Sequence, residues 1–192
     1  MRKFIFIFLL LLCFQFSMAQ VIVKRDVEIE KMVKEIHADS LKAYINKLVS
    51  FGTRNTLSTQ ANSSRGIGAA RAWILSKFNQ FAQHATGRLS ATIDTVTYLP
   101  DGKRVNRPIV LGNVVATLKG TDPNDKRIFI ISGHLDNMRS SVMDSVGDAP
   151  GADDDGSGTV AVMECARVMS KHAFPATIIF VTVAGEDRKS VV

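Results

Sequence analysis

Two short apolar segments, residues 128–131 and 177–183, constrain the fold of this chain more than any other feature. Between them, residues 159–171 carry apolar side chains at helical spacing and a narrow polar stripe. A strand, a helix and a second strand in this order predict a βαβ unit. Strands that are apolar throughout are typical of a parallel sheet with helices on both faces. We therefore predict the α/β class, with a mixed, largely parallel central sheet flanked by helices.

The segments before this unit predict further helices and strands. Apolar positions recur at helical spacing within 26–51, with a break near Asp39-Ser40, and again over about 64–81. The pattern then changes to that of strands over 91–98 and 109–118. We expect one domain, since no internal repeat or linker interrupts the pattern.

The first 19 residues have the pattern of a secretory signal peptide. Arg2 and Lys3 precede an apolar run from Phe4 to Phe14, and small residues end the segment at Ala19. This run is much shorter than the roughly 20 residues that a membrane span needs. We expect a secreted or periplasmic protein without a stable membrane anchor after cleavage, and an uncleaved anchor is the alternative.

Charge and cysteine content exclude two classes of protein. Loss of the two basic residues of the signal lowers the net charge from +6 to +4, without the one-sided cluster of Lys and Arg that nucleic-acid binding requires. We therefore expect no nucleic-acid partner. Cleavage also removes Cys13 and leaves Cys165 alone, so an intrachain disulfide is excluded. Stability must come from a core or a bound metal.

Polar clusters follow both apolar strands of the βαβ unit. His134 and Asp136 end the first, and Glu186 and Asp187 end the second. Because ligands of open α/β sheets bind outside the carboxyl ends of the strands, both clusters should face one crevice. A third acidic cluster, 153–155, lies between them in the sequence.

The acidic charge of this region indicates a bound cation. Six aspartates and one arginine fall between residues 136 and 155, and so much like charge in a compact site requires neutralisation. Histidine with carboxylates, without thiolate, suits catalytic Zn²⁺. We expect His134 to bind the metal and Asp136, on the same side of the strand, to accept the second ring N–H.

Other interpretations of these acidic residues remain open. Asp153, Asp155 and Gly156 match part of a calcium-binding loop, but Gly151 and Val162 stand where that loop needs acids. Glu186 could be a metal ligand, a general base or a residue at a strand edge. We favour a general base, which takes a proton from water and returns it to a leaving amine. The remaining histidines, at 37, 84 and 172, have no nearby carboxylate at ligand spacing and are expected at the surface or at helix ends.

Three segments together resemble the co-catalytic di-zinc exopeptidases of clan MH, family M28. They are Ser132-Gly133-His134-Leu135-Asp136, the stretch 150–158, and Val183-Ala184-Gly185-Glu186. The loop 50–55 is a weaker match. The resemblance implies that His134 binds one zinc, that Asp154 bridges two zinc ions, and that a cis peptide follows Asp154.

The resemblance also assigns the remaining residues. It implies that Asp136 supports His134, that Glu186 is the general base, and that Asp187 stands where the family has a zinc-binding Glu. The resemblance thus implies a secreted zinc-dependent aminopeptidase, in which a bridging hydroxide attacks peptide substrates and their N-terminal amino acids are released. Carboxypeptidase and glutaminyl cyclase activities of the same fold are alternatives, and so is a non-catalytic metal-binding domain.

These expectations divide the chain into three parts. Residues 1–19 are the signal peptide, and 20–186 are the N-terminal part of a peptidase catalytic domain, because the family takes a further Asp and His from downstream. Residues 187–192 are expected to be non-native, since this hexapeptide is what the start of a widely used sequencing adapter encodes. Such a fragment would be inactive alone.

Overall fold

The computed structural model describes residues 25–186 and confirms the α/β class. The elements are α2 (Val27–Lys34), α3 (Ala38–Val49), α4 (Gly66–Ala82), β1 (Leu89–Tyr98), β2 (Ile109–Leu118), β3 (Ile128–His134), the π-helical turn η2 (Ala152–Ser157), α5 (Gly158–Met169) and β4 (Thr177–Val183). The predicted signal peptide and the six-residue tail lie outside the described residues.

The described strands form one mixed sheet in the order β1-β2-β4-β3. β3 and β4 run parallel, with Ile128 opposite Thr177 and His134 opposite Val183, as the βαβ prediction requires. The β1–β2 and β2–β4 pairs are antiparallel. The expectation of a largely parallel sheet is therefore met only at β3–β4, because the hairpin β1–β2 places an antiparallel neighbour beside β4.

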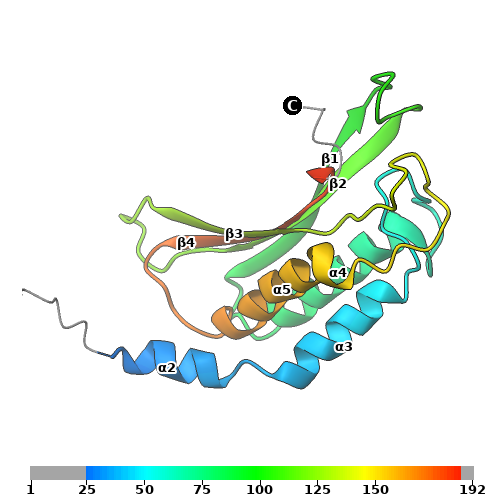
Figure 1. Cartoon of the computed structure of the whole chain (residues 1–192). Helices are drawn as coiled ribbons and strands as arrows, with labels where there is room; N and C mark the ends of the chain where they lie inside the picture. The colour runs from blue at the N-terminus through cyan, green and yellow to red at the C-terminus, as the bar shows by residue number, and fades with distance from the viewer. Residues whose placement is uncertain (1–24, 187–192) are drawn as a thin grey trace, which may run out of the picture. The chain divides into compact units, whose positions relative to one another are not determined.

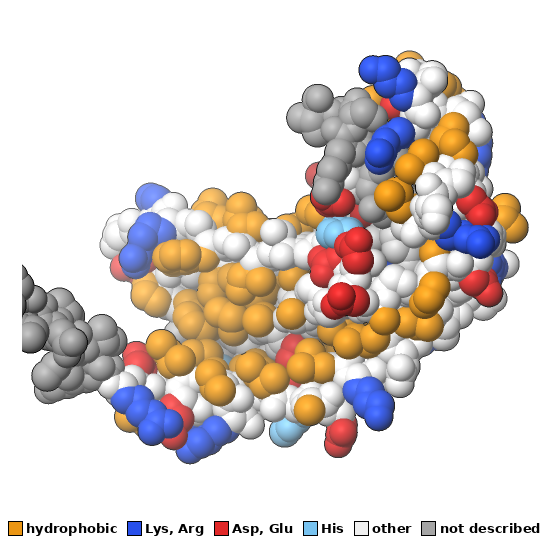
Figure 2. Space-filling view, in the orientation of Figure 1, with side chains coloured by type: hydrophobic (Ala, Val, Ile, Leu, Met, Phe, Trp, Pro, Cys, Tyr) orange, Lys and Arg blue, Asp and Glu red, His pale blue; other side chains and the backbone are white. Residues whose placement is uncertain are grey.

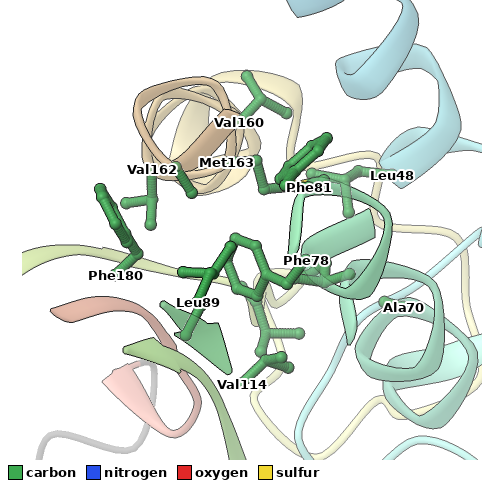
Figure 3. Close-up of a cluster of buried hydrophobic side chains, with 14 of the residues drawn as sticks. Leu48, Ala70, Phe78, Phe81, Leu89, Val114, Val160, Val162, Met163 and Phe180 are labelled. Carbon is green, nitrogen blue, oxygen red and sulfur yellow. The ribbon is translucent and has the colours of Figure 1, made fainter. Parts of the chain in front are cut away.

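Helices α4 and α5 pack on one face of this sheet, with α3 against α5 (Figure 1). Figure 3 shows the core that results, one cluster of buried side chains that includes Phe78 and Phe81 of α4, Met163 of α5 and Phe180 of β4. Phe78, Met163 and Phe180 are completely buried. This core fixes α5 against the ends of β3 and β4, where the polar clusters begin.

Strand β3 differs from the prediction in its burial. Its apolar run predicts a strand covered on both faces, yet Ile128, Phe129 and Ile130 are 60%, 54% and 65% exposed. Within residues 25–186, β3 lies at the edge of the sheet, and the helical elements that pack against it are chiefly α5 and the turn η2, so its first residues are not covered on both faces.

The break between the first two helices also differs from the prediction. It lies at residues 35–37, and α3 already begins at Ala38, ahead of the expected Asp39-Ser40. The backbone N–H of His37 donates to the buried Glu164 carboxylate of α5 at 3.0 Å, which holds this turn in place. Helix α2 precedes the turn and is amphipathic, with exposed Val27, Ile29 and Val33. None of the helices within the described range is long and apolar enough to cross a membrane.

Candidate metal centre

The two predicted ligand-bearing strands end at the same edge of the sheet. His134 is the last residue of β3 and lies opposite Val183, the last residue of β4, and Glu186 follows three residues later. Figure 2 shows a histidine side chain among acidic side chains on the surface at this place. The parallel register therefore brings both clusters to one edge.

The His134 ring has an acidic neighbour at each nitrogen. Its Nε2 lies 3.1 Å from Oδ1 of Asp154. Its Nδ1 lies 3.1 Å from the backbone carbonyl oxygen of Asp136 and 3.7 Å from the Asp136 carboxylate. The atom of Asp136 nearest to Nδ1 is therefore its main-chain oxygen, and not the carboxylate that the sequence predicts as the acceptor of the ring N–H.

Burial separates these two aspartates. Asp136 is fully buried and accepts a hydrogen bond from the Thr56 hydroxyl at 3.0 Å. The Asp154 side chain is 86% exposed. The Asp136 carboxylate raises the pKa of His134 to about 9 against the opposing effect of burial, and the charge of Asp155 adds to it. The negative charge that stabilises a proton on this ring also favours a divalent cation at Nε2.

The three consecutive aspartates have different surroundings. One carboxylate oxygen of Asp155 accepts the backbone N–H of His134 at 2.9 Å, and the other accepts that of Gly158 at 2.7 Å. Asp153 is exposed. The peptide bond between Asp154 and Asp155 is cis, which confirms the expectation from the family resemblance. Asp154 is therefore the member of the triplet that faces the histidine.

A close backbone contact fixes the start of α5 against the end of β3. A Cβ atom on Gly133 would lie 2.7 Å from the carbonyl carbon of Gly158, so a larger residue does not fit there. The Thr159 hydroxyl donates to the carbonyl oxygen of His134 at 2.9 Å. These contacts place the residues that follow Asp155 directly beside His134.

The donor set fits a zinc site of which the described residues supply two facing groups. An imidazole nitrogen and a carboxylate oxygen are zinc ligands, and a buried Asp behind the histidine is the usual supporting partner. No cluster of three or more His, Cys, Asp or Glu side chains at metal-binding distance occurs within residues 25–186. Glu186 is partly buried beyond the end of β4, and Asp187 lies outside the described residues.

Several contacts at this site were not predicted from the sequence. Thr56 and Thr159 donate hydrogen bonds to residues 80 and 25 positions away in the sequence, and no local sequence pattern predicts these bonds. His172 lies just after the end of α5, in line with the expected helix-end position, and its Nε2 lies 3.1 Å from the Glu35 carboxylate. This partner is 137 residues away in sequence and could not be found from local spacing.

Comparison with known proteins agrees with this geometry. Residues 113–191 match the model described as Peptidase family M28. A probable zinc metalloprotease of Leptosphaeria maculans is 45% identical over 161 residues, which is 84% of this chain and 37% of that protein. The chain belongs to peptidase family M28. It spans about a third of the length of the curated relatives that it matches.

Solved structures show the same fold as this M28 chain. The LapA aminopeptidase of Legionella pneumophila is similar with a TM-score of 0.62 and 24% identity, covering 89% of this chain and 43% of that one. The glutaminyl cyclase of Tannerella forsythia is similar with a TM-score of 0.59 and 20% identity, covering 79% of this chain and 48% of that one. The βαβ unit therefore belongs to a fold that this aminopeptidase and this glutaminyl cyclase share.

Proposed function

We propose that this chain forms part of a zinc-dependent aminopeptidase that removes N-terminal residues from peptides. The observation that carries the proposal is the 3.1 Å approach of His134 Nε2 to Asp154 Oδ1 at the carboxyl end of β3. An imidazole nitrogen and a carboxylate oxygen in this position are of the types that make two of the ligands of a catalytic zinc site. The curated relatives described as zinc metalloproteases support the same class of reaction.

Each residue of the site has a distinct part in the proposal. His134 and Asp154 hold zinc, and the exposed Asp154 carboxylate leaves room for a second ion. The main-chain oxygen of Asp136 orients the imidazole ring through its contact with Nδ1. The position that follows Glu186, which is Asp187 in this sequence, is proposed to carry a further zinc ligand. Zinc, when bound, supplies a Lewis acid for the substrate carbonyl and lowers the pKa of water.

Glu186 is the proposed general base. It lies beyond the last residue of β4, on the strand that pairs with the histidine-bearing β3. A carboxylate there takes a proton from the attacking water and returns it to the leaving amine. Replacement of Glu186 by Gln in the product of the complete gene should abolish turnover of leucine p-nitroanilide and leave zinc content unchanged. Retained hydrolysis would remove this assignment.

Metal titration tests the ligands directly in this chain. Isothermal titration with Zn²⁺ should show binding that H134A and D154N each weaken by at least about 100-fold, because each variant removes a ligand. H84A is the matched control, since His84 is exposed on the surface after α4, and it should bind zinc like the unsubstituted chain. Unchanged affinity in H134A would refute the proposed site.

Glutaminyl cyclase is the second candidate activity. Its support is the fold shared with the solved cyclase of Tannerella forsythia. The product of the complete gene, offered a peptide with N-terminal Gln, decides between the two. Release of free glutamine indicates the aminopeptidase, and release of ammonia with a pyroglutamyl product indicates the cyclase.

We also propose that the protein is exported to the periplasm or the medium. The support is the sequence of residues 1–19, with two basic residues before a short apolar run. Sequencing of the N-terminus of the mature protein tests this, because cleavage after Ala19 leaves Gln20 as the first residue.

A further inference from the structure

Arg54 is a buried charged side chain near the metal centre that the proposed reaction does not use. It lies in the loop between α3 and α4 and has no exposed surface. A guanidinium remains charged in proteins and carries five N–H donors in a rigid planar arrangement. Burial of such a group is unfavourable unless its donors are satisfied.

The guanidinium of Arg54 donates hydrogen bonds to main-chain carbonyls from three parts of the chain. Nε donates to Leu135 at 2.7 Å, and Nη2 donates to Gly151 at 2.8 Å. Nη1 donates to Pro150 at 3.0 Å and to Leu48 at 3.3 Å. One side chain thus joins the end of α3 to two loops of the metal centre.

Both loops carry proposed zinc ligands. Leu135 stands between His134 and Asp136 and is itself fully buried. Gly151 directly precedes the turn η2 that contains Asp154, and its carbonyl also accepts the N–H of Gly156 at 3.0 Å. Arg54 therefore bonds the backbone one residue after His134 and three residues before Asp154.

The main chain at Arg54 makes the same connection a second time. Its N–H donates to the side-chain oxygen of Asn137 at 2.8 Å, and the Asn137 amide donates to Ala149 at 2.7 Å. The two loops are thus joined through Arg54 on one side and through Asn137 on the other.

We propose that Arg54 is a positioning residue whose planar guanidinium sets the separation between His134 and Asp154. What these two residues bind rests on the proposed function, but the separation itself does not. The proposal concerns the geometry of the donors and not the positive charge. Lys at this position keeps the charge as a compact ammonium. Its N–H groups cannot donate to the carbonyl oxygens of Leu135, Gly151 and Pro150 at the same time.

The variant R54K tests the proposal, with R71K as the matched control. Arg71 is also a buried arginine, 7% exposed, and donates to a backbone carbonyl, that of Val110 on β2. Amide hydrogen exchange of the metal-free chain should accelerate by about tenfold or more at residues 134–137 and 151–157 in R54K and not in R71K. Titration with Zn²⁺ should show affinity about 10- to 100-fold weaker in R54K and unchanged in R71K.

The outcomes separate this proposal from the proposed function. If amide hydrogen exchange in both loops of R54K is as slow as in the unsubstituted chain, the positioning role is overturned, whatever the zinc affinity. Faster exchange with unchanged zinc affinity also overturns it, because the ligand separation would then not depend on Arg54. If the unsubstituted chain binds no zinc, the proposed function fails, and the exchange data alone decide on Arg54.

A measurement on the unsubstituted chain covers the case in which R54K does not fold. Nitrogen-15 spectra of the arginine side chains should show a slowly exchanging Nε–H for Arg54, because it donates to a buried carbonyl. This resonance should shift when Zn²⁺ is added, and that of Arg71 should not. Rapid exchange of the Arg54 Nε–H would overturn the proposal.

Discussion

Replacement of Glu164 by Gln tests how the turn before α3 is attached to the rest of the fold. Glu164 is a 2% exposed carboxylate on α5. It accepts the His37 N–H at 3.0 Å and two hydrogen bonds from Arg167, from Nε at 2.8 Å and from Nη2 at 2.6 Å. Glu164 thus binds the turn at residues 35–37 directly and also orients Arg167, which donates to the Glu35 carbonyl oxygen, while Lys171 and His172 contact the Glu35 carboxylate.

The magnitude follows from the bonds that E164Q removes. The amide keeps one acceptor oxygen and turns an NH₂ group toward donors, so at least one bond to Arg167 is lost together with the charge. A hydrogen bond to a charged group contributes about 1.5–3 kcal/mol. Loss of one partner of a buried pair costs about 3–5 kcal/mol. Because Arg167 keeps 17% of its side chain exposed, we expect the lower end, about 3 kcal/mol.

The pH dependence has a definite sign. Burial alone raises the pKa of Glu164, but the Arg167 guanidinium and the His37 N–H together lower it below its ordinary value of 4.5. A carboxyl whose folded pKa is lowered stabilises the fold above its unfolded pKa, and this contribution is lost as the pH falls through the folded pKa. The difference between E164Q and the parent should therefore be constant near pH 7 and shrink below about pH 4.

Urea unfolding followed by circular dichroism at several pH values measures this difference. E28Q is the control, since Glu28 is 65% exposed and its pair with Lys31 lies at the surface; it should change the free energy of unfolding by less than about 0.5 kcal/mol. A loss below about 1 kcal/mol for E164Q near pH 7 would refute the reasoning. A loss that is the same near pH 3 as near pH 7 would refute the electrostatic part of it.

Three further predictions concern the metal centre and the core. G133A should lower the free energy of unfolding by about 1–3 kcal/mol in the same assay, because its Cβ would lie 2.7 Å from the backbone of Gly158, whereas S132A at an exposed neighbouring position should have little effect. D155N should cost about 1–2 kcal/mol and weaken Zn²⁺ binding in titration, since it removes a charged acceptor of two backbone N–H groups; equal zinc affinity would contradict this role. Burial and the nearby Glu164 raise the pKa of Cys165, so its alkylation, followed by mass spectrometry, should be slow near pH 7.5 and become rapid on unfolding.

The elements of the βαβ unit could be predicted because their signals are local. Strand β4 has the predicted bounds, and α5 begins within one residue of the prediction. The continuous apolar run predicts β4 and the helical spacing of apolar residues predicts α5, and both patterns lie within their own segments. The exposure of β3 could not be predicted in this way, because an apolar run shows which residues avoid water but not which neighbours cover them.

The residues of the candidate site also fall into those that local sequence patterns predict and those that depend on distant contacts. The sequence located His134, Asp136, Asp154 and Glu186 at strand ends and near the start of α5, because parallel strands bring their carboxyl ends together. Arg54 and Asn137 were missed as parts of this site. Their roles consist of hydrogen bonds to segments 81 to 97 residues away and within the loop 137–149.

The aspartate triplet shows why spacing alone could not assign the ligands. From the sequence alone, any of the three consecutive aspartates could bind a metal ion. A calcium-binding loop would use Asp153 and Asp155. In the fold, both oxygens of Asp155 accept backbone N–H groups, one from β3 and one from α5. That carboxylate joins the strand to the helix, and the exposed Asp154 is left facing Nε2 of His134. The proposal of Asp154 as the ligand therefore depends on which neighbouring carboxylate already accepts hydrogen bonds from the backbone.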